Sequence, residues 1–141
     1  MVSQVMRRRD WRSRLSAALD QVAAAPFDWG RHDCLTGLLH AVTMAVIDTD
    51  CTFMWRGRYR SARGALRVLR NDGFAGLADL AASILPEIHP SAATDGDIAA
   101  IPTDDGFGHA LGIVIGPQVM VMSPAGLAPV PRDRIDRAFK V

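Results

Sequence analysis

The spacing of apolar residues along this chain changes once, near Pro90. Before it, apolar residues recur at helical spacing; after it, Gly, Pro and Asp interrupt short apolar runs that are typical of strands. Helices are expected at about 7–24, 34–47, 61–69 and 77–85, and strands at 97–101, 109–115, 119–122 and 127–130, with a last edge strand within 132–141. Helices followed by antiparallel strands indicate an α+β domain.

The length and composition favour a single domain covering residues 1–141. The chain has 141 residues, of which 49% are hydrophobic, which is enough for one substantial core. No repeat or long linker divides it. We therefore expect a basic N-terminal helix in 1–25, a helical half in 26–90 and a sheet half in 91–141, with a loop over 48–59.

Cys34 opens the second expected helix, and His109 opens the second expected strand. A thiol is a good nucleophile only as a thiolate, which a helix N-terminus favours and which Asp33 can help to place by capping that helix. A histidine within reach can act as the general base. Either residue alone could be structural, but together they predict a thiol nucleophile site between the two halves, with the loop 102–108 at its rim.

The backbone N–H of Cys34 is expected to stabilise the oxyanion that forms during attack on a carbonyl, because it lies at a helix start. A second donor could come from the side chain of Tyr59 or His32. Both of these residues could instead have a structural or surface role.

Three segments resemble the NlpC-like cell-wall cysteine peptidases, which are papain-like in core architecture. Residues 27–34 carry Trp-Gly-x-x-Asp-Cys after an aromatic residue, residues 96–101 open with Gly-Asp, and residues 109–116 form an apolar run behind a His. The order Cys, Gly-Asp, His is specific in combination. The run 55–64 is similar to a compact subgroup encoded mainly in phage tail gene clusters and related gene-transfer particles.

The resemblance implies an NlpC-type fold, with N-terminal helices packed on a small antiparallel sheet or half-barrel. It implies Cys34 as nucleophile and His109 as base. A third polar residue on the next strand should orient the histidine, but there the chain has Met122 followed by Ser123. Ser123 is the better candidate and Gln118 the second, while a backbone carbonyl or a water could also serve.

Asp33, Trp29 and Tyr59 are candidate substrate-binding residues on the same resemblance. The family often has a small Ser after the nucleophile that helps bind the free amino end of the stem peptide, whereas this chain has Leu35. The resemblance implies a peptidase or amidase that acts on peptidoglycan stem peptides or cross-links during phage entry, without metal or cofactor. A transferase would use the same residues, and a structural tail-tip or hub protein with reduced or no activity is the alternative.

Arginines gather in two stretches of a chain whose net charge is only +1. The two groups are Arg7, Arg8, Arg9, Arg12 and Arg14, and Arg56, Arg58, Arg60, Arg63, Arg67 and Arg70. Solvated helix faces or docking surfaces for hub, distal tail or tip proteins are favoured over nucleic-acid binding, because no aromatic platform accompanies the charge.

Cys34 and Cys51 fit neither a disulfide scaffold nor a metal motif, which favours reduced thiols and synthesis in the host cytoplasm. No membrane span or signal peptide is expected, since the first residues contain no apolar core. Carriage in a virion tail tip would then deliver such an enzyme to the periplasm and cell wall.

Overall fold

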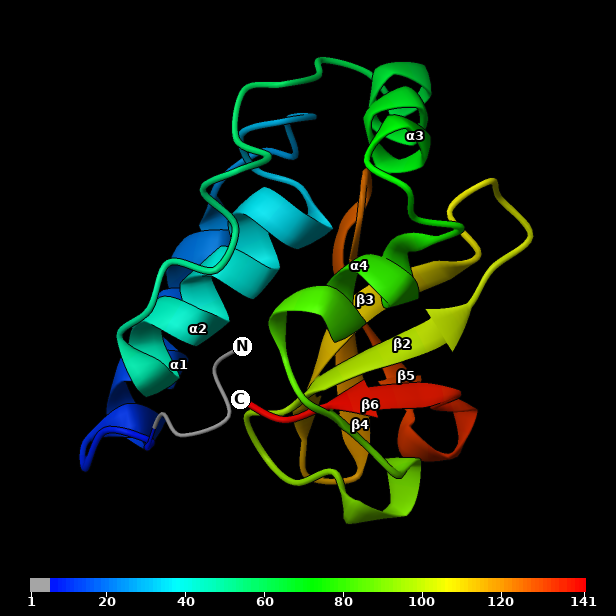
Figure 1. Ribbon diagram of the computed structural model, residues 1–141. Helices are drawn as coiled ribbons and strands as arrows, with labels where there is room; N and C mark the ends of the chain where they lie inside the picture. The colour runs from blue at the N-terminus through cyan, green and yellow to red at the C-terminus, as the bar shows by residue number, and fades with distance from the viewer. Residues whose placement is uncertain (1–5) are drawn as a thin grey trace.

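A computed structural model describes residues 6–141 (Figure 1). The α-helices are α1 (Trp11–Ala24), α2 (His40–Ile47), α3 (Ala62–Asn71) and α4 (Leu77–Ile84), and a π-helical segment, Cys34–Leu39, leads directly into α2. The strands are β1 (Glu87–Ile88), β2 (Ile98–Pro102), β3 (His109–Ile115), β4 (Gln118–Ser123), β5 (Gly126–Pro131) and β6 (Arg137–Phe139), with short 3-10 turns at Pro90–Ala92 and Arg132–Arg134. The expected α+β class is confirmed.

The six strands form one antiparallel sheet in the order β1-β6-β2-β3-β4-β5. The last strand, β6, lies between β1 and β2, so the expectation that it forms an edge is wrong. The two-residue strand β1 was not expected, and it occupies that edge instead. The last strand is therefore second from the edge and is paired on both sides.

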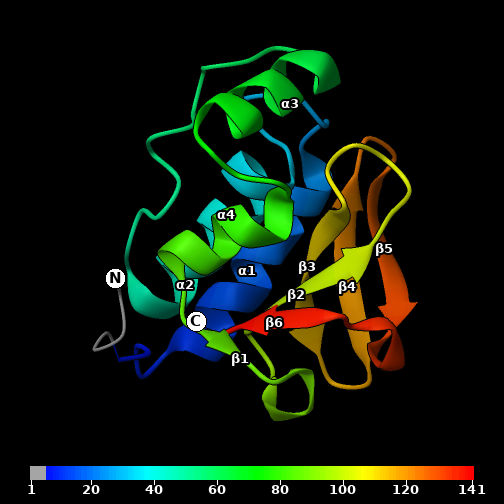
Figure 2. The same ribbon diagram turned by 45° about the vertical axis from the view of Figure 1, so that its right-hand side comes forward.

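The helices cover one face of the sheet (Figure 2). Side chains alternate along the strands, so Leu111 and Ile113 of β3 pack against the helices while Val114 joins a smaller cluster on the other face. Five residues expected in the core of the second helix are all buried: Leu35, Leu38, Leu39, Val42 and Val46. The first helix begins at Trp11 rather than near Arg7, and residues 1–5 of the expected basic helix lie outside the described residues.

Arg7, which was expected at the start of the first helix, instead lies before it and binds other parts of the chain. Its guanidinium donates to the Val141 carbonyl at 2.9 Å, to the Asp95 carbonyl at 2.7 Å and to Asp97 Oδ1 at 2.9 Å. These contacts hold the segment before α1 against the sheet and the C-terminus. Within residues 6–141, none of the helices has the length and apolar character needed to cross a membrane.

Candidate active site

The start of the helix that carries Cys34 is built around the Asp33 carboxylate, which is 1% exposed. Its Oδ1 accepts from the N–H groups of Leu35 at 2.9 Å and Thr36 at 2.8 Å, and from the Thr36 hydroxyl at 2.9 Å. Its Oδ2 accepts from Gly30 N–H at 2.9 Å and from the Tyr59 hydroxyl at 2.7 Å. The expected N-cap is confirmed.

Five donors saturate the lone pairs of the Asp33 carboxylate. Asp33 and Tyr59 were both candidates for substrate binding. Their polar atoms instead form hydrogen bonds with each other, and Asp33 also bonds to neighbouring backbone groups and to Thr36. Burial, together with the negative charge of Asp33, raises the pKa of the Tyr59 phenol well above its ordinary value. The pair ties the Cys34 helix to the loop 48–61.

The first turn after Asp33 is wider than an α-helical turn. The Asp33 carbonyl accepts from both Gly37 N–H at 2.9 Å and Leu38 N–H at 3.0 Å. Such π-helical turns occur frequently at functional sites. Gly37 lies directly against His32, since a Cβ there would come within 2.8 Å of the ring Nδ1.

Cys34 is half-buried and is a free thiol, as is Cys51. Burial and, after it, the charge of Asp33 raise the pKa of the Cys34 thiol to about 12, although the Leu111 N–H donates to the sulfur and opposes the shift. The expectation that the helix start favours a thiolate is therefore wrong for the resting protein. The enclosed position and the adjacent carboxylate both act against the thiolate.

His109 opens β3 opposite Pro102, and it shares the helix-facing side of that strand with Leu111. Leu111 contacts the Cys34 sulfur, so His109 lies two residues, about 7 Å along the strand, from that contact. Its ring Nε2 pairs with Asp136 Oδ2 at 2.7 Å. With the Asp136 carboxylate as acceptor, Nε2 carries the proton and Nδ1 is the basic nitrogen.

Asp136 takes the position that was assigned to Ser123, and the Ser123 assignment is wrong. Ser123 also lines the cavity, but its hydroxyl accepts from Ala125 N–H at 3.2 Å, and within residues 6–141 it makes no hydrogen bond to the His109 ring. The second candidate, Gln118, is exposed and pairs with Ile115 at the far end of β3. Asp136 instead precedes β6, where its N–H donates to the Ala100 carbonyl at 3.0 Å.

Cys34 and His109 line one cavity of about 310 Å³. Trp29, the third candidate for substrate binding, forms part of its wall and stacks on Phe107 with ring centroids 5.8 Å apart. Phe107 belongs to the loop 103–108, which confirms that this loop rims the site. In the described residues, no hydrogen bond joins the Cys34 thiol to the His109 ring, although both residues line the same cavity.

The proposed oxyanion donor, Cys34 N–H, is available. Apart from the sulfur of Cys34 itself, no protein acceptor for this N–H is found across residues 6–141. Both candidates for a second donor are already engaged, because the Tyr59 hydroxyl donates to Asp33 and His32 Nε2 pairs with the Val22 carbonyl at 3.0 Å. The geometry fits the alternative that Tyr59 and His32 have structural roles.

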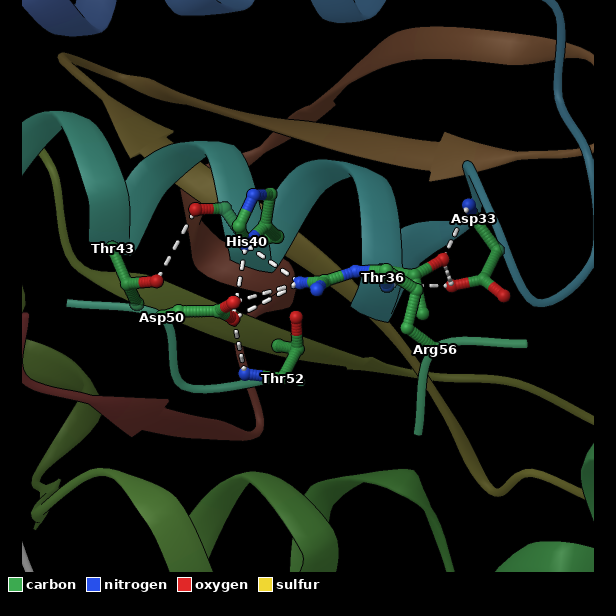
Figure 3. A network of polar contacts seen from close by, with 7 residues as sticks. All are labelled: Asp33, Thr36, His40, Thr43, Asp50, Thr52 and Arg56. Atoms are coloured by element: carbon green, nitrogen blue, oxygen red, sulfur yellow. Dashed lines mark hydrogen bonds and ion pairs between the residues drawn. The ribbon is translucent and has the colours of Figure 1, made fainter. Parts of the chain in front are cut away.

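Figure 3 also shows a second polar network, which joins His40 of α2 to the loop that follows this helix. Asp50 accepts from Arg56 Nη2 at 3.0 Å and lies 3.2 Å from His40 Nδ1. Although burial opposes it, the bonds from Arg56 and from Thr52 N–H lower the pKa of Asp50. The Thr52 hydroxyl is buried and, among the described residues, has no hydrogen-bond partner. The network anchors the loop 48–60 to α2.

No group of three or more metal-ligating side chains occurs in the part of the chain that the structure describes.

Fold and site together define an α+β domain with a cysteine at a helix start and a paired histidine on the facing sheet. The chain belongs to a family described as a domain of unknown function, DUF6950, whose profile matches residues 6–141. Searches of curated proteins and of solved structures each found no match.

Proposed function

We propose that this domain is a cysteine hydrolase, a peptidase or amidase that cleaves amide bonds in peptidoglycan stem peptides or cross-links. One observation carries the reaction class: Cys34 and a histidine held by a carboxylate line the same cavity. The substrate class comes from the resemblance to the NlpC-like peptidases in residues 27–34, 96–101 and 109–116.

In the proposed reaction, His109 Nδ1 takes the thiol proton while Cys34 Sγ attacks the amide carbonyl. Because the pKa of the thiol is raised, this transfer accompanies the attack rather than preceding it. The oxyanion accepts from Cys34 N–H, and Asp136 stabilises the imidazolium through Nε2–H.

Collapse of the tetrahedral intermediate breaks the C–N bond, and the imidazolium passes its proton to the leaving amine. The acyl group remains on Cys34 as a thioester. His109 then takes a proton from water as the hydroxide attacks that thioester, and returns it to the departing sulfur. An acceptor amine in place of water would give the transferase.

The proposed setting is a phage or gene-transfer particle, on the resemblance of residues 55–64. The protein would be made in the host cytoplasm, bind hub, distal tail or tip proteins, and act at the cell wall after injection. Its partners are then tail proteins and peptidoglycan peptides rather than a specific nucleic acid.

A structural tail-tip protein is the second candidate, and two observations favour it. The pKa of Cys34 is raised, and Leu35, which is buried, stands where the family often has a small Ser. Exposed arginines of α3, Arg63 and Arg67, would then form part of a docking surface.

The deciding experiment is mass spectrometry of muropeptides after incubation of purified peptidoglycan with the wild-type protein, Cys34→Ala and His109→Ala. Assembled tail fractions serve as a second source of the wild type. New fragments that disappear with either variant support the hydrolase and identify the bond. Intact peptidoglycan with every preparation supports the structural protein.

A further inference from the structure

Among residues 6–141, no lysine or arginine lines the cavity beside Cys34 and His109, and the carboxylates that line it belong to Asp33 and Asp105. A carboxylate placed here would lose its hydration next to groups of the same charge, with no cation to compensate. The charges of the lining therefore disfavour an anionic group in this pocket.

Most polar atoms of the lining already have partners within the chain. Asp33 and the Tyr59 hydroxyl bond to each other. The Thr103 hydroxyl donates to Asp105 Oδ1 at 2.6 Å, and that oxygen also accepts from Phe107 N–H at 3.0 Å. The Ser123 hydroxyl accepts from Ala125 N–H at 3.2 Å. Cys34, His109, this hydroxyl and the other oxygen of Asp105 are thus the polar groups of the lining that remain for chemistry.

Most of the rest of the lining is aromatic and aliphatic. It comes from the segment around Cys34, the loop before α3, α3, α4, the loop 103–108, and strands β3 and β4 with the turn that follows, and it includes Phe27, Trp29, Trp55, Leu69, Leu80 and Phe107. The loop 103–108 reaches α3 at one side, where a Cβ on Gly106 would lie 3.0 Å from Leu66. The volume of about 310 Å³ is at the lower end of the range for small-molecule pockets, roughly 300–1,000 Å³.

We propose that the amide cleaved by this domain carries an uncharged, bulky apolar group, aromatic or branched aliphatic, which fills this pocket while the carbonyl lies at Cys34. The inference rests on the proposed cysteine hydrolase and narrows its substrate. The residues of peptidoglycan stem peptides are small or charged and lack such a group, so the inference favours an apolar amide over the stem peptide. Apolar burial supplies the binding energy, and the few polar groups supply the chemistry.

Two alkylating reagents of the same size and branching test the preference: N-(3-methylbutyl)iodoacetamide, which is neutral and apolar, and N-(2-carboxyethyl)iodoacetamide, which is anionic. Peptide mass spectrometry gives the rate at each cysteine of the intact protein. We expect the apolar reagent to alkylate Cys34 at least about tenfold faster than the anionic one. The thiol is the same in both reactions, so its pKa cancels in the ratio, and Cys51, which does not line the pocket, is the internal reference with a smaller ratio.

A pocket-filling variant supplies the second readout. Ala62 is exposed and lines the pocket, so Ala62→Trp should fold and bring the Cys34 ratio down to that of Cys51. The matched control is Arg63→Trp, the next residue, which is exposed and outside the lining. Equal rates with the two reagents at Cys34, or an unchanged ratio in Ala62→Trp, overturn the inference.

The two proposals fail separately. A protein that cuts muropeptides but alkylates Cys34 without preference keeps the hydrolase and loses the apolar substrate. A protein that shows the preference but cleaves neither muropeptides nor N-acylated phenylalanine amides overturns the hydrolase, and with it the assignment of the pocket to a substrate amide.

Discussion

Asp33, beside Cys34, and Asp136, beside His109, have different roles because their surroundings differ. Asp33 is 1% exposed and is saturated by hydrogen bonds from its own chain, so it shapes the helix start and, by its charge, disfavours the thiolate. The Asp136 side chain is 53% exposed and has one partner, the His109 ring. Asp136 is therefore a positioning residue for the base, whereas Asp33 is a structural one.

Asp136→Ala should lower kcat for muropeptide cleavage with little change in KM. A hydrogen bond to a charged group contributes about 1.5–3 kcal/mol, which corresponds to a loss of roughly 10- to 100-fold. Asp136→Asn should recover part of the rate, since its amide oxygen can still accept from Nε2–H. Asp133→Ala, exposed in the neighbouring turn, is the control, and an equal effect in both alanine variants would refute the role of Asp136.

Alkylation of Cys34 by iodoacetamide should become about tenfold faster per pH unit between pH 7 and 10. Burial and the Asp33 charge raise the pKa of this thiol to about 12, so the reactive thiolate is the minor form throughout and its fraction rises with pH. Mass spectrometry of the labelled peptide measures the rate. A plateau below about pH 9 would mean that the protein stabilises the thiolate after all.

The element that carries the nucleophile depends on a close approach between its preceding turn and the loop 48–60. Gly30 has a left-handed φ of +84°, and a Cβ there would overlap the Tyr59 carbonyl oxygen. The Gly30 carbonyl also accepts from Gly57 N–H at 2.8 Å. This contact brings Tyr59 to Asp33, and so fixes the start of the Cys34 helix.

Gly30→Ala should destabilise the fold by several kcal/mol, with Gly57→Ala as the matched control. Gly57 also has a left-handed φ, +78°, but a Cβ there would meet nothing within 4 Å. Its substitution costs only the backbone strain, about 1–2 kcal/mol. Urea unfolding followed by circular dichroism gives both values. Similar losses of unfolding free energy in the two variants would show that the backbone at Tyr59 moves to make room for the added methyl group.

Local patterns were sufficient for most elements of this fold. The strand at 109–115 is found at its expected bounds, and Ser61 caps α3 as its position suggested. The π-helical turn after Asp33 has no such signal, because hydrogen bonds from Gly37 and Leu38 to one carbonyl depend on packing against His32. Element existence follows from periodicity, whereas the geometry of a turn follows from what it packs against.

At the scale of the whole molecule, the sequence could not supply the partner of His109. Asp136 reaches the ring because β6 inserts beside β2, and that order depends on contacts between residues far apart in the chain. The resemblance placed the partner on the following strand, where Met122 packs into the core instead. Cys34 and His109 could be found from local context, and the residue that completes the site could not.

The same topology brings both ends of the described chain together at Asp97, a carboxylate that is 1% exposed. Asp97 accepts from Arg7 at 2.9 Å and from Val141 N–H at 3.0 Å, while Thr94 N–H donates to its other oxygen at 2.9 Å. This cluster gives the Gly-Asp segment a structural role, and it uses an arginine that the sequence suggested for docking.

Arg7→Ala should lower the free energy of unfolding by about 3 kcal/mol, because it leaves the buried Asp97 carboxylate without its cation. Arg12→Ala is the control: the Arg12 side chain is 72% exposed, it lies 3.4 Å from Asp95, and surface pairs contribute about 0–1 kcal/mol. Urea unfolding measures both losses. In the double variant Arg7→Ala with Asp97→Asn, the loss should be smaller than the sum of the single losses, since the uncompensated charge is removed. Strictly additive losses would mean that Arg7 acts through its bonds to the Asp95 and Val141 carbonyls rather than through Asp97.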